Sequence, residues 1–138
     1  MFYKFNAYGH PNIQGTHKTT LEFTKDGEVS LKGNCIVGVK ADFELEKIKK
    51  FIKNYKNKRI TIKIKTISKY KKMQAIIEAE LNPDFNSNKE FVIRKTNFVS
   101  DRTFAIKADN ASFNLNKGLI NFLKEKKNKI SVIIKDKQ

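Results

Sequence analysis

The sequence predicts a mainly β protein, either an antiparallel sandwich or a partly closed barrel of about nine short strands with two packed helices. Alternation of apolar and polar residues with a period of two dominates the chain, which is typical of half-buried strands. Most of these stretches are linked by turns of hairpin length, and only two segments have helical spacing. The strands and helices do not alternate regularly, which argues against a parallel α/β sheet.

Four strands are expected before the first helix. The second has the clearest alternation, with Leu21 and Phe23 on one face and Glu22 and Thr24 on the other. The Asp26-Gly27 pair is a hairpin signal, so the third strand should pair back on the second. The fourth is expected to be short and buried. These strands are segments 2–8, 17–25, 29–31 and 35–39.

The sequence signals for the two helices differ in strength. The first should begin after Asp42 as the N-cap and end near Tyr55, with apolar residues at Leu45, Ile48 and Ile52. The second should occupy about residues 110–126, although a glycine lies in its middle. Its apolar candidates are Phe113, Leu115, Ile120 and Leu123.

Five further strands complete the expected fold, at 59–67, 73–80, 91–95, 103–108 and 130–134. The turn-rich stretch 82–88 is interpreted as a hairpin loop, not a linker, because 138 residues suit one domain over 1–138. The apolar phases of the strands and of the first helix predict a buried core. It comprises Leu21, Phe23, Val37, Ile48, Ile52, Ile60, Ile62, Ile64, Phe91, Ile93, Phe104 and Ile106.

The chain is strongly basic, with 29 basic and 14 acidic residues and a net charge of +15. Such a charge favours a polyanionic partner such as RNA or DNA. A second explanation competes, because all but three of the basic residues are lysines and there is no Trp, a composition that an AT-rich genome produces in any protein. Composition therefore leaves both readings open.

Several classes of protein are excluded by what the chain lacks. No apolar run approaches the roughly 20 residues of a membrane span, and the first ten residues lack the layout of a secretory signal. A single cysteine excludes an internal disulfide and a zinc site built from several thiolates. We therefore expect a soluble cytoplasmic protein without a membrane partner.

Residues 8–39 gather both histidines, the only cysteine and five of the six glycines. His10, beside Asn12 in a loop, His17 and Cys35 would together suit a soft divalent metal, or a cysteine nucleophile with a histidine base. Their spacing matches no established zinc signature, so no metal site is assigned. The alternative is structural: a small buried cysteine and two hydrogen-bonded histidines.

The polar run from Gly15 to Thr20 is a candidate anion site. Lys18, Thr19 and Thr20 offer an ammonium and hydroxyls near an exposed loop backbone, which would hold a phosphate or a carboxylate. The glycine spacing is wrong for a Walker loop, and a strand is expected to follow where that motif needs a helix. Threonines alternating on a half-exposed strand are the plainer explanation.

Two of the three arginines, Arg94 and Arg102, flank one loop in a chain that otherwise uses lysine. This suggests a requirement for the guanidinium geometry. It would serve either bidentate binding of an anion or an internal salt bridge with Glu22, Asp101 or Asp109.

A further candidate is the lysine set on the first helix and the next strand, proposed as a nucleic-acid face. No exposed aromatics appear interleaved with it to stack on bases, and a solvated surface is the usual explanation of such a set. The candidate lysines are Lys49, Lys53, Lys56, Lys63 and Lys65.

Four blocks, in order, resemble one archaeal family. They are GHPNI, THKTTLEFT, GNCIVGV and VIRKTNFVSDRTFAIKAD, spread over nearly the whole chain. The family is catalogued as domain of unknown function 371. The resemblance implies a single-domain, mainly β archaeal protein, and it supplies no activity and no functional residues.

The favoured function is a module that binds an anionic partner, with RNA ahead of a phosphorylated small molecule. The alternative is a small enzyme whose pocket would be formed by His10, His17, Thr19, Cys35 and Arg102, which requires the stretches 9–20 and 97–103 to meet in space. A subunit that functions only within a complex is a third reading. The sequence assigns no cofactor and no oligomeric state.

Overall fold

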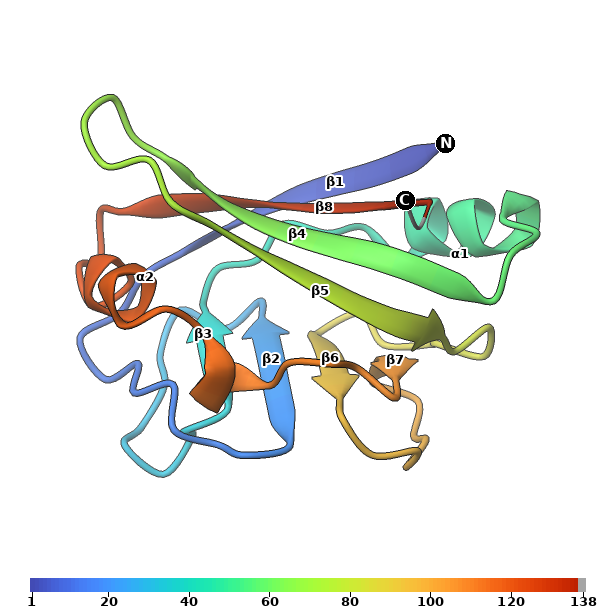
Figure 1. Cartoon of the computed structure of the whole chain (residues 1–138), viewed down its shortest axis with the longest axis horizontal. Coiled ribbons are helices and arrows are strands. Elements are labelled where there is room, and N and C mark those ends of the chain that lie inside the picture. The colour runs from blue at the N-terminus through green and yellow to red at the C-terminus, as the bar shows by residue number, and fades with distance from the viewer. Residues whose placement is uncertain (137–138) are drawn as a thin grey trace.

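A computed structural model of the chain describes residues 1–136 and confirms a mainly β fold with two helices (Figure 1). The eight strands form one mixed sheet in the order β1-β8-β4-β5-β7-β6-β2-β3. No helix in these residues is long and apolar enough to cross a membrane. The strands are β1 (Phe2–Tyr8), β2 (Thr20–Thr24), β3 (Ile36–Gly38), β4 (Arg59–Ile67), β5 (Gln74–Leu81), β6 (Glu90–Arg94), β7 (Thr103–Ile106) and β8 (Lys129–Asp136).

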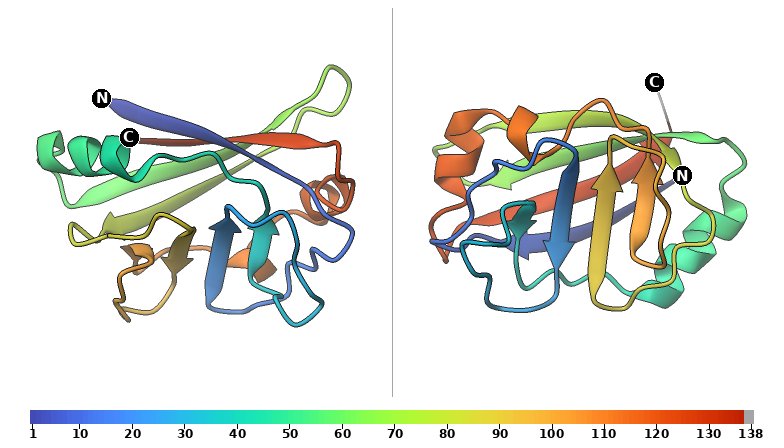
Figure 2. Two further views of the ribbon diagram at one scale, coloured as in Figure 1. Left: turned by 180° about the vertical axis from the view of Figure 1, so that it is seen from behind. Right: turned by 90° about the horizontal axis from the view of Figure 1, so that it is seen from below.

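The sheet folds over into two layers, which cross each other in Figure 2. The upper layer of Figure 1 contains β1, β8, β4 and β5, all antiparallel. The lower layer contains β7, β6, β2 and β3, and only a short pairing of β5 with β7 continues the sheet between them. The sheet is not closed into a barrel: in the described part of the chain its two edges meet at one bridge, between Tyr8 and Val39.

A cluster of phenylalanine side chains fills the space between the layers. The ring of Phe91 lies 4.3 Å from that of Phe104 and 5.0 Å from that of Phe5, measured between ring centres. The predicted core residues are buried, except that Ile52 and Ile106 are half-buried. Helix α1 (Leu45–Asn54) adds Ile48 and covers one end of the core, and α2 (Lys117–Phe122) covers the other end (Figure 1).

The hairpin predicted at Asp26-Gly27 is wrong, because residues 29–31 form no strand. Strand β2 pairs with β6 in antiparallel orientation and with β3 in parallel. This register sets Phe23 opposite Phe91, and their rings lie 6.1 Å apart in the core. Packing between residues distant in sequence thus outweighs the local turn signal, and Val29 is buried from a loop.

The stretch 82–88 is likewise not a hairpin loop, since β5 pairs with β7 and not with β6. It connects the two layers and inserts Phe85, which is 1% exposed, into the core. Asn82 anchors its start by donating a hydrogen bond to the Thr103 carbonyl at 2.7 Å. Because β7 then joins β6 in parallel, the sheet is mixed, not wholly antiparallel.

Both helices begin later than their sequence signals indicate. Asp42 does not cap α1: its carboxylate accepts a hydrogen bond from the backbone of Asn6 at 2.7 Å, and the helix starts three residues later. The second segment is broken into a 3-10 turn (Ser112–Asn114) and the short α2, because the Asn116 side chain caps the Gly118 N–H and starts a new helix. Phe113 is consequently 57% exposed and not part of the core.

Candidate functional site

His10 and Asn12 hold the loop that follows β1. The His10 side chain is buried, and its Nε2 lies 2.9 Å from a Glu28 carboxylate oxygen. Its Nδ1 accepts a hydrogen bond from the Asn12 backbone, and the Asn12 amide donates to the Val29 carbonyl. These contacts tie two loops together, and they account for both side chains structurally.

His17 organises the turn that enters β2. Its Nδ1 accepts hydrogen bonds from the backbone N–H groups of Thr19 and Thr20, at 3.2 and 3.0 Å. Lys18, which lies between His17 and Thr19, is exposed. Among residues 1–136 there is no group of three or more His, Cys, Asp or Glu side chains that could hold a metal ion.

Cys35 lies next to a buried carboxylate. Its Sγ is 3.8 Å from Oε1 of Glu22. Burial, together with the nearby negative charge of Glu22, raises the pKa of the Cys35 thiol to about 11. A cysteine nucleophile needs a lowered pKa, so this environment does not suit cysteine catalysis.

Glu22 is the centre of a polar cluster on the outer face of the lower layer. Its neighbours Leu21 and Phe23 point into the core, so the carboxylate projects to the other side, yet Glu22 is only 4% exposed. Arg102 bridges it to Glu90, with Nη1 3.4 Å from Glu22 and 2.9 Å from Glu90. Burial and the adjacent Glu90 raise the pKa of Glu22 to about 7, against the opposing effect of Arg102.

Both candidate arginines thus make contacts with other side chains of the protein. Arg94 donates through Nε to the Thr103 hydroxyl at 2.9 Å, and its guanidinium lies 4.9 Å from the ring centre of Phe98. Burial and the charge of Arg102 lower the Arg94 pKa. Of the two explanations for the arginines, the internal salt bridge with Glu22 is therefore confirmed for Arg102.

The sequence-predicted residues are only partly brought together. Cys35, Arg94 and Arg102 meet around Glu22, whereas His10 is bonded to Glu28 and His17 to its own turn. Among the described hydrogen bonds, none links the stretches 9–20 and 97–103. The sequence did not identify Glu90 as a partner of Arg102. The one available signal was that Glu90 alternates with the inward-facing Phe91 and so points to the outer face of β6.

A second candidate surface is the outer side of the upper layer, here called the open face. In Figure 1 neither helix covers this side. The inward residues of β1, β4, β5 and β8 are buried, so alternate residues point outward. Strand register sets them in rows: Phe2, Lys135, Thr61 and Glu78; Lys4, Ile133, Lys63 and Ile76; Asn6, Ser131, Lys65 and Gln74; Tyr8, Lys129 and Ile67.

Aromatic side chains do accompany lysines on the open face, contrary to the expectation from the sequence. Phe2 is 67% exposed and lines a hollow of about 420 Å³ with Ile133 and Lys135. At the other end of β1, the Lys129 ammonium lies 5.7 Å from the ring centre of Tyr8. Sequence distance concealed this arrangement, because β1 and β8 come from opposite ends of the chain.

The lysines of the open face make no ion pairs within the described residues, although Glu78 lies in the same row as Lys135. None of its lysines, Lys4, Lys63, Lys65, Lys129 and Lys135, has an ion-pair partner within residues 1–136. Near one end of the upper layer, by contrast, Glu80 is within 4 Å of Lys58, Arg59 and Lys107. Three buried oxygen atoms of the face, Asn6 Oδ1, Glu78 Oε2 and Ser131 Oγ, have no hydrogen-bond partner among the described residues.

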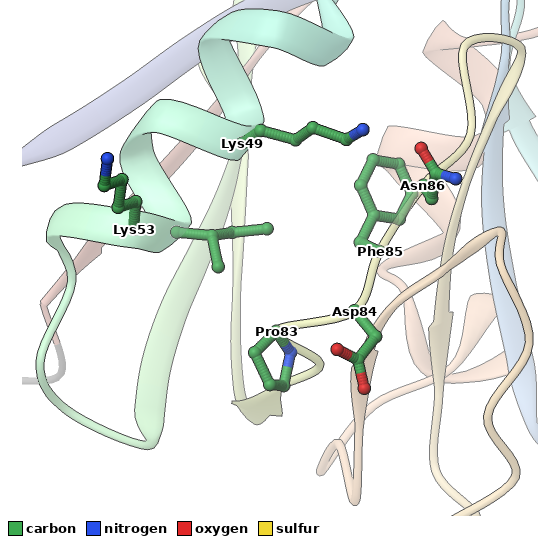
Figure 3. Close-up of a pocket in the computed structure, with 7 residues that line it drawn as sticks. Lys49, Lys53, Pro83, Asp84, Phe85 and Asn86 are labelled. Atoms are coloured by element: carbon green, nitrogen blue, oxygen red, sulfur yellow. The ribbon is translucent and has the colours of Figure 1, made fainter.

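The lysines of α1 lie on another surface. Lys49 and Lys53 line a groove of about 400 Å³ together with residues 83–86. Figure 3 shows Lys49 extending toward this loop and Lys53 pointing away from it. Lys56 donates to the Lys53 carbonyl at 3.5 Å. The five lysines proposed from the sequence therefore do not share one face.

Comparison with known proteins agrees with the four sequence blocks. Residues 5–137 match the family model described as "Domain of unknown function (DUF371)". The chain belongs to this family. The DUF371 match extends from Phe5 in β1 to the end of β8, and so includes the Glu22 cluster and most of the open face. The "Uncharacterized protein MJ0206" of Methanocaldococcus jannaschii is 34% identical over 138 residues, covering 97% of this chain and 99% of that protein.

Proposed function

We propose that the open face binds single-stranded RNA. The observation that carries this proposal is the juxtaposition, on one uncovered antiparallel face, of two aromatic side chains of β1, Phe2 and Tyr8, with five lysines that have no ion-pair partner within residues 1–136. Single-stranded nucleic acids are bound in this way, by cations along the backbone and by rings on which bases stack.

The lysines supply the electrostatic part of the interaction. Lys4 lies on β1, and Lys63 and Lys65 lie in adjacent rows of β4, with β8 between the two strands, so their ammonium groups do not crowd at one point. Each phosphate neutralised by such a group releases a counterion, which favours binding without regard to sequence. Because none of these lysines has an internal partner, no ion pair must be broken first.

The aromatic side chains supply contacts to bases. Phe2 presents an exposed ring beside the hollow at Ile133, and Tyr8 lies at the opposite end of the same strand. A base stacked on a ring of this kind contributes about 1–3 kcal/mol.

The shape of the face favours a flexible strand over a duplex or a small ligand. A sheet surface with side chains in rows is broad and shallow, and bases held in a duplex are not free to stack on it. A phosphorylated small molecule would contact only one or two of the lysines. An extended strand contacts several at once, which makes the fullest use of the charge.

The test is fluorescence anisotropy with a labelled unstructured RNA oligonucleotide of about twelve residues. If about four phosphates are contacted, the logarithm of the binding constant should fall with the logarithm of salt concentration with a slope of about −3. Reversing Lys4, Lys63 and Lys65 to glutamate should abolish binding at 100 mM salt. Phe2→Ala should weaken it by about fivefold to a hundredfold, the value of one stacked base.

The control for the charge reversal is the triple variant Lys49→Glu, Lys53→Glu and Lys56→Glu, in and just after α1, which changes the net charge equally away from the open face. Phe98→Ala is the control for Phe2→Ala, because Phe98 is similarly exposed, at 59%. The proposal fails if RNA does not bind at low salt. It also fails if the two triple variants weaken binding equally, since net charge alone would then explain the affinity.

A further inference from the structure

We propose that a second site, in the cavity between residues 14–16 and α2, binds a small aromatic phosphate of the nucleoside monophosphate class. The cavity has a volume of about 510 Å³ and shares no lining residue with the open face. It is lined by Gln14, Gly15, Thr16, Phe113, Leu115, Lys117, Ile120, Asn121 and Lys124. This volume lies within the range of small-molecule sites in proteins, about 300–1,000 Å³.

The walls of the cavity are apolar and suit a flat ring. Phe113, which is 57% exposed, stands on one side, and Leu115 and Ile120 provide aliphatic surface. Gly15 has a positive φ of 63°, and a Cβ there would lie 2.5 Å from the Ile120 side chain. The glycine thus lets the loop backbone pack directly on Ile120, and its lack of a side chain leaves the adjoining space open.

The charged side chains that line the cavity are both positive. Lys117 and Lys124 are its only charged lining residues, and no carboxylate contributes to it. Lys124 is held in place by a hydrogen bond from its ammonium to the Ile13 carbonyl at 2.6 Å, whereas Lys117 has no ion-pair partner in residues 1–136. A ligand that neutralises both should therefore carry a multiply charged anion.

The remaining groups distinguish a nucleotide from a simple aromatic acid. The amides of Gln14 and Asn121 and the hydroxyl of Thr16 can both donate and accept hydrogen bonds at the edge of the apolar wall. Such groups suit the ring nitrogens and ribose hydroxyls of a nucleoside. The Gly15–Thr20 run is the candidate anion site of the sequence analysis, and its first two residues line this cavity.

The experiment is a titration of the 15N-labelled protein with AMP, followed by amide chemical shifts, with adenosine, phenyl phosphate and inorganic phosphate as separate probes. AMP should shift the amides of residues 14–16 and 117–124, and the other three probes should each bind at least about tenfold more weakly. Equal affinity for AMP and inorganic phosphate would overturn the assignment of an aromatic ligand. Equal affinity for AMP and phenyl phosphate would overturn that of a nucleotide.

Two pairs of variants locate the site. Lys117→Met and Phe113→Ala should each weaken AMP binding by about tenfold. Their controls, Lys50→Met on α1 and Phe98→Ala, remove equally exposed residue types elsewhere and should leave it unchanged. The absence of shifts with AMP, GMP and UMP at several millimolar would refute the proposal, as would shifts confined to β1, β4 and β8. The variant with Lys4, Lys63 and Lys65 reversed to glutamate, which should not bind RNA, should still bind AMP. The two proposals can therefore fail independently.

Discussion

Replacing Glu22 by glutamine should remove a pH dependence from the stability of the fold. The Glu22 side chain is 5% exposed and is held between Arg102, Glu90 and the Cys35 thiol. Its pKa rises from 4.5 to about 7, mainly because burial disfavours the charged form and because Glu90 is close. In the unfolded chain neither effect operates.

The sign and size of the effect follow from this difference. A carboxyl whose pKa is raised in the fold binds a proton that the unfolded chain has already released, so the free energy of unfolding falls as pH rises from 4.5 to 7. Each pKa unit corresponds to about 1.4 kcal/mol, which sets an upper limit near 3 kcal/mol. Because Glu90, whose charge contributes to the raised pKa, is 30% exposed and partly screened by solvent, we expect a loss of about 1–3 kcal/mol.

The assay is urea denaturation of the natural protein and of the Glu22→Gln variant at pH 5, 6, 7 and 8. Glutamine keeps the size and an acceptor oxygen but cannot ionise, so the fall in stability between pH 5 and 7 should be absent from the variant. Glu46→Gln, at an exposed position of α1, should keep the dependence of the natural protein. Parallel curves for the natural protein and Glu22→Gln would refute the reasoning.

Two further predictions concern buried groups. Phe104→Ala should destabilise the protein by roughly 3–5 kcal/mol in the same denaturation assay, because the ring is fully buried and stacked on Phe91, whereas the exposed Phe98→Ala should cost far less. Alkylation of Cys35 by iodoacetamide at pH 8 should be about a hundredfold slower than that of a free cysteine, since a thiol pKa of about 11 leaves little thiolate. A rate equal to that of glutathione would contradict the raised pKa.

The strands and the core were predictable because alternation is a local property. Strand β4 has the bounds expected from the sequence, and β1 does too. The apolar phase of each strand also identified its buried side, since a side-chain period of two leaves little freedom in which face meets the core. Phe43 and Phe85 were not identified, because they reach the core from segments without periodicity.

The connections between strands were not predictable, because they depend on contacts distant in sequence. The turn signal at Asp26-Gly27 specifies a hairpin only if the next segment supplies a partner strand. Here β6 takes that place, some 70 residues later, because it sets Phe91 against Phe23 and Phe5. The prediction of a single second helix over residues 110–126 was wrong for a local reason. The Asn116 side chain caps a new helix at Gly118, which competes with a helix that continues through residue 116.

Rare and common residues carried different information about the candidate sites. The rare histidines and arginines mark internal contacts: His10 with Glu28, Arg102 with Glu22, and Arg94 with Thr103. A residue used seldom is retained where its geometry is needed, and that need is as often structural as functional.

Lysine is too common in this chain for its number to distinguish function from genome composition, so our proposal depends on where the lysines lie in the fold. Lysines added by composition alone would be expected to scatter over the surface and to meet carboxylates where these occur, as Lys58 and Lys107 meet Glu80. On the open face, strands from both ends of the chain bring lysines together beside Phe2 and Tyr8 without ion pairs. Leaving such charges unpaired forgoes internal ion pairs, and a polyanion bound there would neutralise them. For this reason our proposal of an anionic partner rests on the arrangement of the lysines, and not on the net charge of the chain.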